Sequence, residues 1–303
     1  MAGRLNTLRV AVASAATAIV AAGVLASPAA AINTYNASPA PERTETGALL
    51  VLWDTDGDGV DDSFDWHCTG AMIDRDTFLT ASHCIVDWSA DPSLDHFYVS
   101  LDQNVQGELD AAAALGLSGA AEARYFLAHG QAVEGSGIVD PSYGQAQSDP
   151  HDIAVVDFAH RAVTPADRWS FTPAKLPTAG RLSALSSSQL EAAPWLAVGY
   201  GTEEAHTGGG PQTHPGGGIR LKASLGFDAL NASWIRLSMI EAQGYGGACY
   251  GDSGGPNFVT LNGVLLLAGV TVTGDTPCYA TNVAYRTDTG SARSFLAPYV
   301  RLA

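Results

Sequence analysis

The stretch Gly251-Asp252-Ser253-Gly254-Gly255-Pro256 decides how the rest of this chain is interpreted, because it encloses one serine closely between glycines. These glycines permit a tight backbone turn, in which the amides of Gly251 and Ser253 can converge on one oxygen while the serine hydroxyl projects outward. The motif therefore predicts an oxyanion hole beside a nucleophile. A serine hydroxyl is a weak nucleophile at neutral pH, so a histidine base and a carboxylate that orients it are required elsewhere in the chain.

Two upstream motifs supply these partners. The sequence TASHC contains His83, and the sequence HDIAVV contains Asp152. In the chain order His, Asp, Ser, the three motifs resemble the signatures of the trypsin/chymotrypsin family of serine peptidases, and the resemblance extends over residues 47–301. It implies a triad in which Ser253 attacks the substrate, His83 is the base and Asp152 orients His83. We expect activity to rise with pH as His83 loses its proton.

The pattern of apolar and turn-forming residues favours an all-β fold. Short apolar runs are separated by clusters of Gly, Asp, Pro and Ser from Ala48 onward. The resembled family implies two antiparallel six-stranded barrels, with the catalytic cleft between them and a closing C-terminal helix. The expected boundaries are a peptidase domain at 48–301, a first barrel at about 48–165, a second barrel at about 166–288 and a helix at about 291–300. The alanine-rich stretch at 108–127 has no strand alternation and predicts an inserted surface loop with some helix.

The N-terminus predicts secretion. Residues 1–31 contain two arginines, an alanine-rich apolar run and small residues at a plausible cleavage point, which is the pattern of a signal peptide. Residues 32–47 have no periodicity and indicate a leader or a short pro-segment. The net charge of -16 gives no support to nucleic-acid binding or to a membrane contact after the signal is removed. We expect a monomer that acts on protein or peptide substrates and needs no cofactor for catalysis.

The four cysteines are expected to form disulfides in an oxidising compartment. Four cysteines allow three connectivities, and spacing alone does not choose among them. The resemblance implies that Cys68 pairs with Cys84 beneath the histidine and that Cys249 pairs with Cys278 beside the specificity pocket. Each bridge would then brace a catalytic residue, and each would contribute on the order of 3 kcal/mol in the chain-entropy model.

The resemblance also places a primary specificity pocket. Gly247 and Ala248 would form its base, and its walls would come from Gly274 and its neighbours and from Asn282. No carboxylate lies at this expected base, so a Lys or Arg side chain would lose its hydration there without finding a partner. We therefore expect an uncharged residue before the scissile bond.

Asp252 is expected to be the activation carboxylate. In the resembled family the carboxylate next to the nucleophile pairs with a new N-terminal ammonium after cleavage. The usual Ile-Val-Gly-Gly start is missing here; cleavage after Ala31 would expose Ile32, and cleavage after Arg43 would expose Thr44. We favour processing within residues 32–47, and a constitutively active enzyme is the alternative.

An acidic stretch close to the start of the domain predicts a calcium site. Acids at alternate positions followed by glycine match the spacing of an oxygen-ligand loop. The expected ligands are Asp54, Asp56, Asp58, the Val60 carbonyl, Asp62 and Asp65. The ion would be structural, and the alternative is a solvated acidic hairpin turn.

Two other functions share some of these features. A catalytically silent, peptidase-like binding module would usually lack a triad residue, whereas all three are present here. A lipase or esterase needs a histidine after its nucleophile, and no histidine follows Ser253. His151 is a rival base beside Asp152, but His83 lies beside a cysteine as the resemblance requires, so we assign His151 to structure or solvent. We predict a secreted serine endopeptidase, with the silent module as the alternative.

Overall fold

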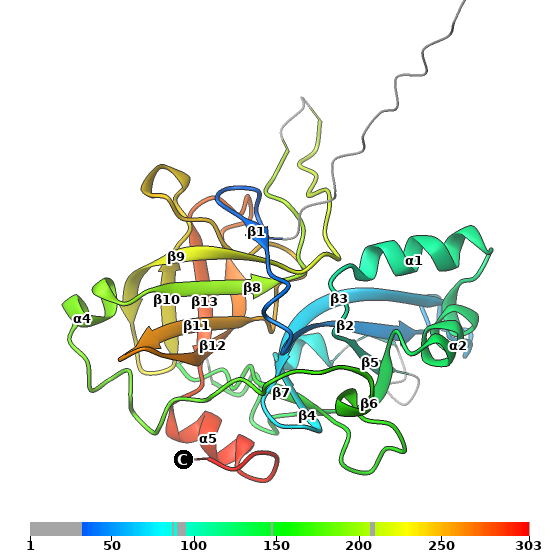
Figure 1. Cartoon of the computed structure of the whole chain (residues 1–303), viewed down its shortest axis with the longest axis horizontal. Coiled ribbons are helices and arrows are strands. Elements are labelled where there is room, and N and C mark those ends of the chain that lie inside the picture. The colour runs from blue at the N-terminus through cyan, green and yellow to red at the C-terminus, as the bar shows by residue number, and fades with distance from the viewer. Residues whose placement is uncertain (1–31, 87, 90–94, 147, 207–209, 303) are drawn as a thin grey trace, which may run out of the picture.

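The computed structural model describes residues 32–302, apart from residues 87, 90–94, 147 and 207–209. The expected signal peptide therefore lies outside the described residues. No helix in the described part of the chain is long and apolar enough to cross a membrane. Figure 1 shows the strands gathered into two bodies that lie side by side, with the C-terminal helix below them.

Six strands of the N-terminal half form a closed antiparallel barrel. They are β2 (Thr46–Trp53), β3 (Ser63–Met72), β4 (Thr77–Thr80), β5 (His96–Ser100), β6 (Val133–Val139) and β7 (Ala154–Asp157). Their order around the barrel is β2-β3-β4-β7-β6-β5. Strand β2 is buried on both faces: Leu49 and Val51 point into the barrel core, whereas Leu50 and Leu52 pack in a second cluster outside it. This double burial explains why β2 is a continuous apolar run rather than an alternating one.

Six strands of the C-terminal half form the second barrel. They are β8 (Trp195–Gly199), β9 (Leu221–Leu230), β10 (Trp234–Ser238), β11 (Pro256–Leu261), β12 (Val264–Gly274) and β13 (Thr281–Arg286). Their order is β9-β10-β13-β12-β11-β8, and pairing of β8 with β9 closes the ring. The expected pair of six-stranded antiparallel barrels is confirmed.

The two barrels are joined by an apolar interface. Leu79 of β4 and Val155 of β7 lie in one cluster with Val198 of β8 and Phe258 of β11. Helix α5 (Gly290–Leu296) adds two buried side chains to this cluster, so it closes the interface as expected, although it ends before residue 300. The shorter helices are α3 (Pro165–Arg168), α4 (Ser187–Ala192) and the 3-10 turns η1 (Ser82–Cys84) and η3 (Glu241–Gln243).

The alanine-rich insertion is a helical hairpin with one buried face. It consists of α1 (Val105–Ala114) and α2 (Gly119–His129), which pack beside the first barrel (Figure 1). The Asn104 side chain accepts a hydrogen bond from the Gly107 amide (2.9 Å) and caps α1. A surface loop with some helix was expected here. The hairpin is more regular than that, because the barrel covers an apolar stripe on each helix.

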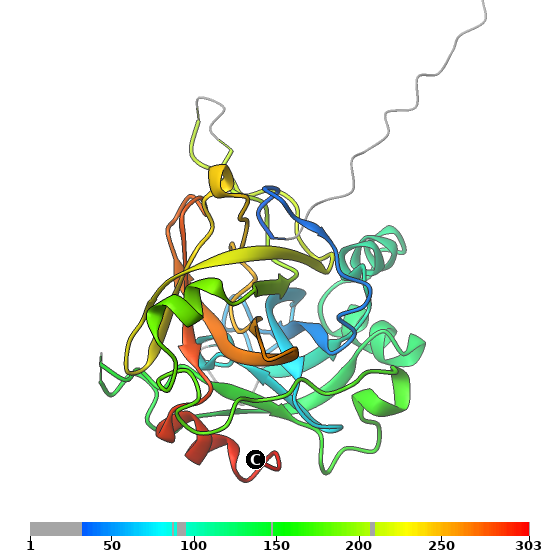
Figure 2. The same ribbon diagram turned by 60° about the vertical axis from the view of Figure 1, so that its left-hand side comes forward.

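Residues 32–47 are part of the folded unit. Ile32 and Ala40 are fully buried, and the short strand β1 (Ser38–Pro39) pairs with β9. Figure 2, turned from the view of Figure 1, shows this segment lying along the second barrel before it enters β2. The segment thus packs as an edge of the second barrel, which the absence of periodicity in its sequence did not indicate.

We expect Phe126→Ala to lower the free energy of unfolding by about 3–5 kcal/mol. Phe126 is fully buried and its ring meets Phe64 of β3 edge to face, with the centroids 5.2 Å apart, so truncation opens a cavity between hairpin and barrel. Leu115→Ala is the control, because Leu115 is 63% exposed at the hairpin turn; it should change stability by no more than about 0.5 kcal/mol. Urea denaturation measures both, and equal small effects would contradict the packing of the hairpin.

Candidate active site

His83 and Asp152 form a hydrogen-bonded pair at the surface of the first barrel. His83 lies in η1, just after β4, and Asp152 lies two residues before β7. The His83 Nδ1 atom is 2.8 Å from Asp152 Oδ2, and the His83 backbone amide donates to Asp152 Oδ1 over 3.0 Å. Because a carboxylate only accepts, Nδ1 carries the proton and Nε2 is left as an acceptor. The two segments are held together by Ser82, whose hydroxyl donates to the Ile153 carbonyl over 2.7 Å.

Ser253 comes from the second barrel and faces the same cleft. It lies in the loop that precedes β11, and it lines a cavity of about 440 Å³ together with His83 and Gly251. The structure thus brings His83 and Ser253 to one cavity, and Asp152 is hydrogen-bonded to His83. The hydrogen bond between the Ser253 hydroxyl and the His83 ring is not formed in this structure, whereas the His83 to Asp152 contact is.

Two backbone amides in the loop at residues 251–255, which carries Ser253 and is called the nucleophile loop below, are free to bind an oxyanion. The amides of Asp252, Gly254 and Gly255 each donate to a backbone carbonyl. Those of Gly251 and Ser253 have no acceptor among the described residues. Gly251 has φ of 91°, and a Cβ there would lie 2.4 Å from the Trp66 ring, so this turn requires glycine.

Thr69 of β3 connects the nucleophile loop to the first barrel. Its amide donates to the Ser253 carbonyl over 2.9 Å, and its hydroxyl donates to the Gly251 carbonyl over 2.9 Å. The Thr69 carbonyl in turn accepts from the Thr80 hydroxyl over 2.9 Å, three residues before His83. Thr69 was not expected from the sequence. Nothing in its local sequence indicates a contact with the loop that carries Ser253, which lies far along the chain.

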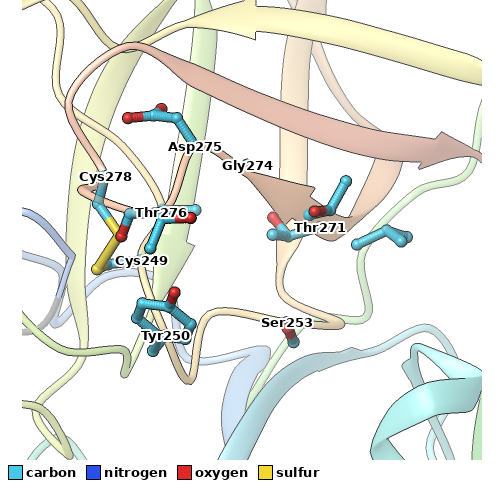
Figure 3. A pocket seen from close by; sticks show the side chains of 11 residues that line it. Cys249, Tyr250, Ser253, Thr271, Gly274, Asp275, Thr276 and Cys278 are labelled. Atoms are coloured by element: carbon cyan, nitrogen blue, oxygen red, sulfur yellow. A yellow bond between two sulfur atoms is a disulfide. The ribbon is translucent and has the colours of Figure 1, made fainter.

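A pocket of about 230 Å³ lies beside Ser253 (Figure 3). Among the residues expected to form the specificity pocket, Ala248 and Gly274 line this one, whereas Gly247 and Asn282 are not among its lining residues. Gly247 is buried, and a Cβ there would meet Met239 at 2.5 Å.

Asn282 is 1% exposed, and its side chain is turned toward Asn257, to which its Nδ2 donates over 2.8 Å. The pocket also has a carboxylate that the sequence analysis missed. Asp275 lines it next to Gly274, as Figure 3 shows. Its oxygens accept hydrogen bonds from the amides of Tyr279 (2.8 Å), Ala280 (3.0 Å) and Thr281 (2.6 Å), so the carboxylate holds its own turn together.

Asp252 is a buried carboxylate without a cation among the described residues. It is 2% exposed and accepts hydrogen bonds from the amides of Gly201 and Cys249, both over 2.8 Å. Burial raises the pKa of Asp252 from 3.8 to about 7 in spite of these amides, because an ionised carboxylate loses its hydration there. The backbone nitrogen of Ile32 lies close by and donates to the Gly201 carbonyl over 3.2 Å.

Both expected disulfides are confirmed. Cys68 is bonded to Cys84, and Cys249 is bonded to Cys278. The first joins β3 to the turn that carries His83, and the second crosses the wall of the pocket in Figure 3.

The acidic loop brings together only part of the expected calcium ligands. Carboxylate oxygens of Asp54, Asp56 and Asp58 lie within 4.8 Å of one another. Asp62 belongs to no such group among the described residues and instead accepts from the Thr55 hydroxyl. Asp65 lies in β3 and lines the cavity with Ser253, and Val60 is an exposed residue whose amide donates to Asp58.

Two other histidines lie near the triad. His67 lines the same cavity as His83, but its ring is packed against Trp53 and Trp88, and burial lowers its pKa to about 4. His151 has a carboxylate at each ring nitrogen, with Asp140 3.0 Å from Nδ1 and Asp149 3.7 Å from Nε2. His83 instead contacts a carboxylate through Nδ1, which leaves Nε2 to act on Ser253, so His83 suits the expected base better than these two histidines.

A family model described as Trypsin matches residues 59–293. This range includes both barrels apart from β2, the His83 and Asp152 pair, Ser253 and all four cysteines. No curated protein matches the chain.

Proposed function

The chain belongs to the trypsin family of serine peptidases, and from that premise we propose that it is a secreted serine endopeptidase. The observation that supports this most directly is the two-point hydrogen bonding of His83 to Asp152, beside a cavity that Ser253 also lines. Two disulfides favour an oxidising compartment and hence secretion. Peptidases of this family need no cofactor for catalysis, and no observation favours the silent binding module.

The proposed mechanism assigns one task to each group. Ser253 attacks the peptide carbonyl while His83 Nε2 takes the hydroxyl proton, and the amides of Gly251 and Ser253 bind the oxyanion. His83 then gives the proton to the leaving amine, and an acyl-enzyme remains. A water molecule attacks the acyl-enzyme, while His83 takes a proton from the water and then returns it to the Ser253 oxygen. Asp152 keeps the imidazole in the tautomer that this requires and stabilises its charged form.

Asp152→Asn should lower turnover by about 10⁴-fold while the fold is kept, because the amide favours the wrong imidazole tautomer. Asp140→Asn is the matched control: Asp140 also contacts a histidine, His151, and its variant should keep near-normal turnover. A fluorophosphonate probe should label the protein at Ser253 and should not label Ser253→Ala. Labelling of the folded, processed protein at any other residue would refute the assignment.

We infer further that the mature chain begins at Ile32. Ile32 is fully buried next to the Asp252 loop, and its φ of 70° is an outlier for a β-branched residue inside a chain. Cleavage before Ile32 would remove this constraint and would place an ammonium close to a buried carboxylate that lacks a cation. Cleavage after Arg43 would instead detach a segment that packs in the fold, so this proposal replaces the processing site that the sequence analysis favoured.

N-terminal sequencing of active protein should therefore give Ile32, and a start at Thr44 would contradict the proposal. The pH dependence of stability gives a second measurement. In unprocessed protein, folded Asp252 keeps its proton up to about pH 7, whereas the unfolded chain loses it near pH 4. Stability therefore falls between these values. Asp252→Asn replaces one of the two accepting oxygens with a donor, so it lowers stability at every pH, but this loss should shrink as the pH rises from about 4 to about 7. In processed protein the ammonium stabilises the carboxylate, so the loss should stay large at pH 7, as urea denaturation would measure.

The primary pocket is proposed to take an uncharged side chain. It contains no cation that would pair with an acidic side chain among its lining residues. Its one carboxylate, Asp275, already accepts three amide hydrogen bonds within its own turn, so a Lys or Arg side chain would have to compete for it. This competition disfavours a basic side chain although a carboxylate lines the pocket.

Cleavage of a mixed peptide library should occur mainly after uncharged residues. Asp275→Asn should keep that preference, because the amides of the turn and not the substrate occupy the carboxylate. Mass spectrometry of the products measures both. Dominant cleavage after Lys or Arg that disappears in Asp275→Asn would show instead that Asp275 recognises the substrate.

A structural calcium ion is proposed at the acidic loop, on a narrower ligand set than the sequence indicated. Asp54, Asp56 and Asp58 support it by their proximity. The alternative, a solvated acidic turn, is supported by Asp54, whose carboxylate already accepts from the Gly57 and Gly59 amides, both over 2.8 Å.

The melting temperature should be higher in millimolar calcium than in EDTA, since an ion that binds only the folded state stabilises it. Asp56→Asn should remove the difference, whereas Asp110→Asn, an exposed acid on α1, should keep it. Equal melting temperatures of the unsubstituted protein in calcium and EDTA would favour the acidic turn.

A further inference from the structure

The side chain of Asn33 is fully buried and uses both ends of its amide. Its Oδ1 accepts a hydrogen bond from the Gly247 amide over 2.9 Å, and its Nδ2 donates to the Cys278 carbonyl over 3.0 Å. The Asn33 backbone amide adds a third bond, to the Gly247 carbonyl over 3.0 Å. Gly247 and Cys278 belong to two different loops, so one side chain joins both.

Both of these loops line the pocket beside Ser253. Ala248 and Cys249 line it from the first loop, and Thr276 and Cys278 line it from the second (Figure 3). The disulfide between Cys249 and Cys278 also joins them, but a single link fixes a separation and leaves the loops free to pivot about it. The Asn33 amide adds a second link at Gly247, two residues before the bridge, and two links fix the orientation of one wall against the other.

The segment that carries Asn33 is itself anchored. The amide and the hydroxyl of Thr34 both donate to the Glu204 carboxylate, each over 2.6 Å. The residue after Glu204, Ala205, donates from its amide to the Pro277 carbonyl of the second pocket loop over 3.1 Å. The segment that carries Asn33 is therefore anchored next to it, and the Asn33 amide can hold the two pocket loops in position.

We propose that Asn33 is a positioning residue that joins the two walls of the specificity pocket, so that discrimination between side chains in the pocket depends on its amide. The proposal rests on the proposed peptidase function. Asparagine suits this place because one short side chain supplies an acceptor and a donor; alanine supplies neither, and serine reaches at most one of the two partners.

The test compares Asn33→Ala and Asn33→Ser with the unsubstituted, processed protein. Two peptide substrates are used that differ only before the scissile bond, one with the preferred residue from the library and one with glycine. A small fluorophosphonate that places no side chain in the pocket reports on the triad alone. Asn36→Gly is the matched control: it removes an exposed side-chain bond from the same segment to Tyr245, and glycine tolerates the φ of 54° at this position.

In both Asn33 variants we expect the ratio of kcat/KM for the two peptides to fall about tenfold, mainly through a higher KM for the preferred peptide. The rate of fluorophosphonate labelling should stay within about twofold, and Asn36→Gly should match the unsubstituted protein in every measurement. An unchanged ratio in the Asn33 variants would overturn the proposal, and so would an equal loss of labelling and hydrolysis, which would indicate general unfolding. If the unsubstituted protein is not labelled at Ser253, the proposed function fails, and this inference fails with it.

Discussion

The contact that the cleft depends on most is made by Thr69, which binds the nucleophile loop of one barrel to a strand of the other. Its amide and hydroxyl hold the carbonyls of Ser253 and Gly251, and its own carbonyl is held by Thr80, close to His83. Thr69 is fully buried, which limits the competition of water for these bonds. A nucleophile and a base that come from different barrels need such a link, because a displacement of about 1 Å is enough to disrupt catalytic geometry.

The apolar interface between the barrels makes this link possible. Side chains of β4 and β7 pack with side chains of β8 and β11, and α5 covers the cluster. Burial of this apolar surface holds the two barrels together but does not fix their relative orientation, because the hydrophobic effect is non-directional. The hydrogen bonds of Thr69 are directional and fix that orientation.

The second half of the site is organised around three buried polar side chains, Asn33 of the N-terminal segment, Glu204 and Asp252. All three are nearly inaccessible, and each accepts a hydrogen bond from at least one backbone amide. A buried amide such as Asn33 can be satisfied completely by neutral partners, whereas a buried carboxylate such as Asp252 keeps a raised pKa until a cation arrives. The two kinds of group therefore have different consequences. The Asn33 amide shapes the pocket, whereas the Asp252 carboxylate makes the stability of the protein depend on processing.

The sequence by itself determined the chemistry of the centre and the fold class. A serine between glycines, a histidine beside a cysteine and an aspartate before an apolar run are local patterns, and each can be recognised from a few consecutive residues. The order of these motifs identified the family, and the family implied the two barrels and the disulfide pairing that the structure contains. The tertiary structure decided which residues surround that centre. Asp275 lines the pocket and Gly247 does not, β1 adds an edge to the second barrel, and Thr69 reaches Ser253. The contacts of β1 and of Thr69 join segments that are far apart in the chain. Their positions follow from how the loops pack, and no local pattern records that packing.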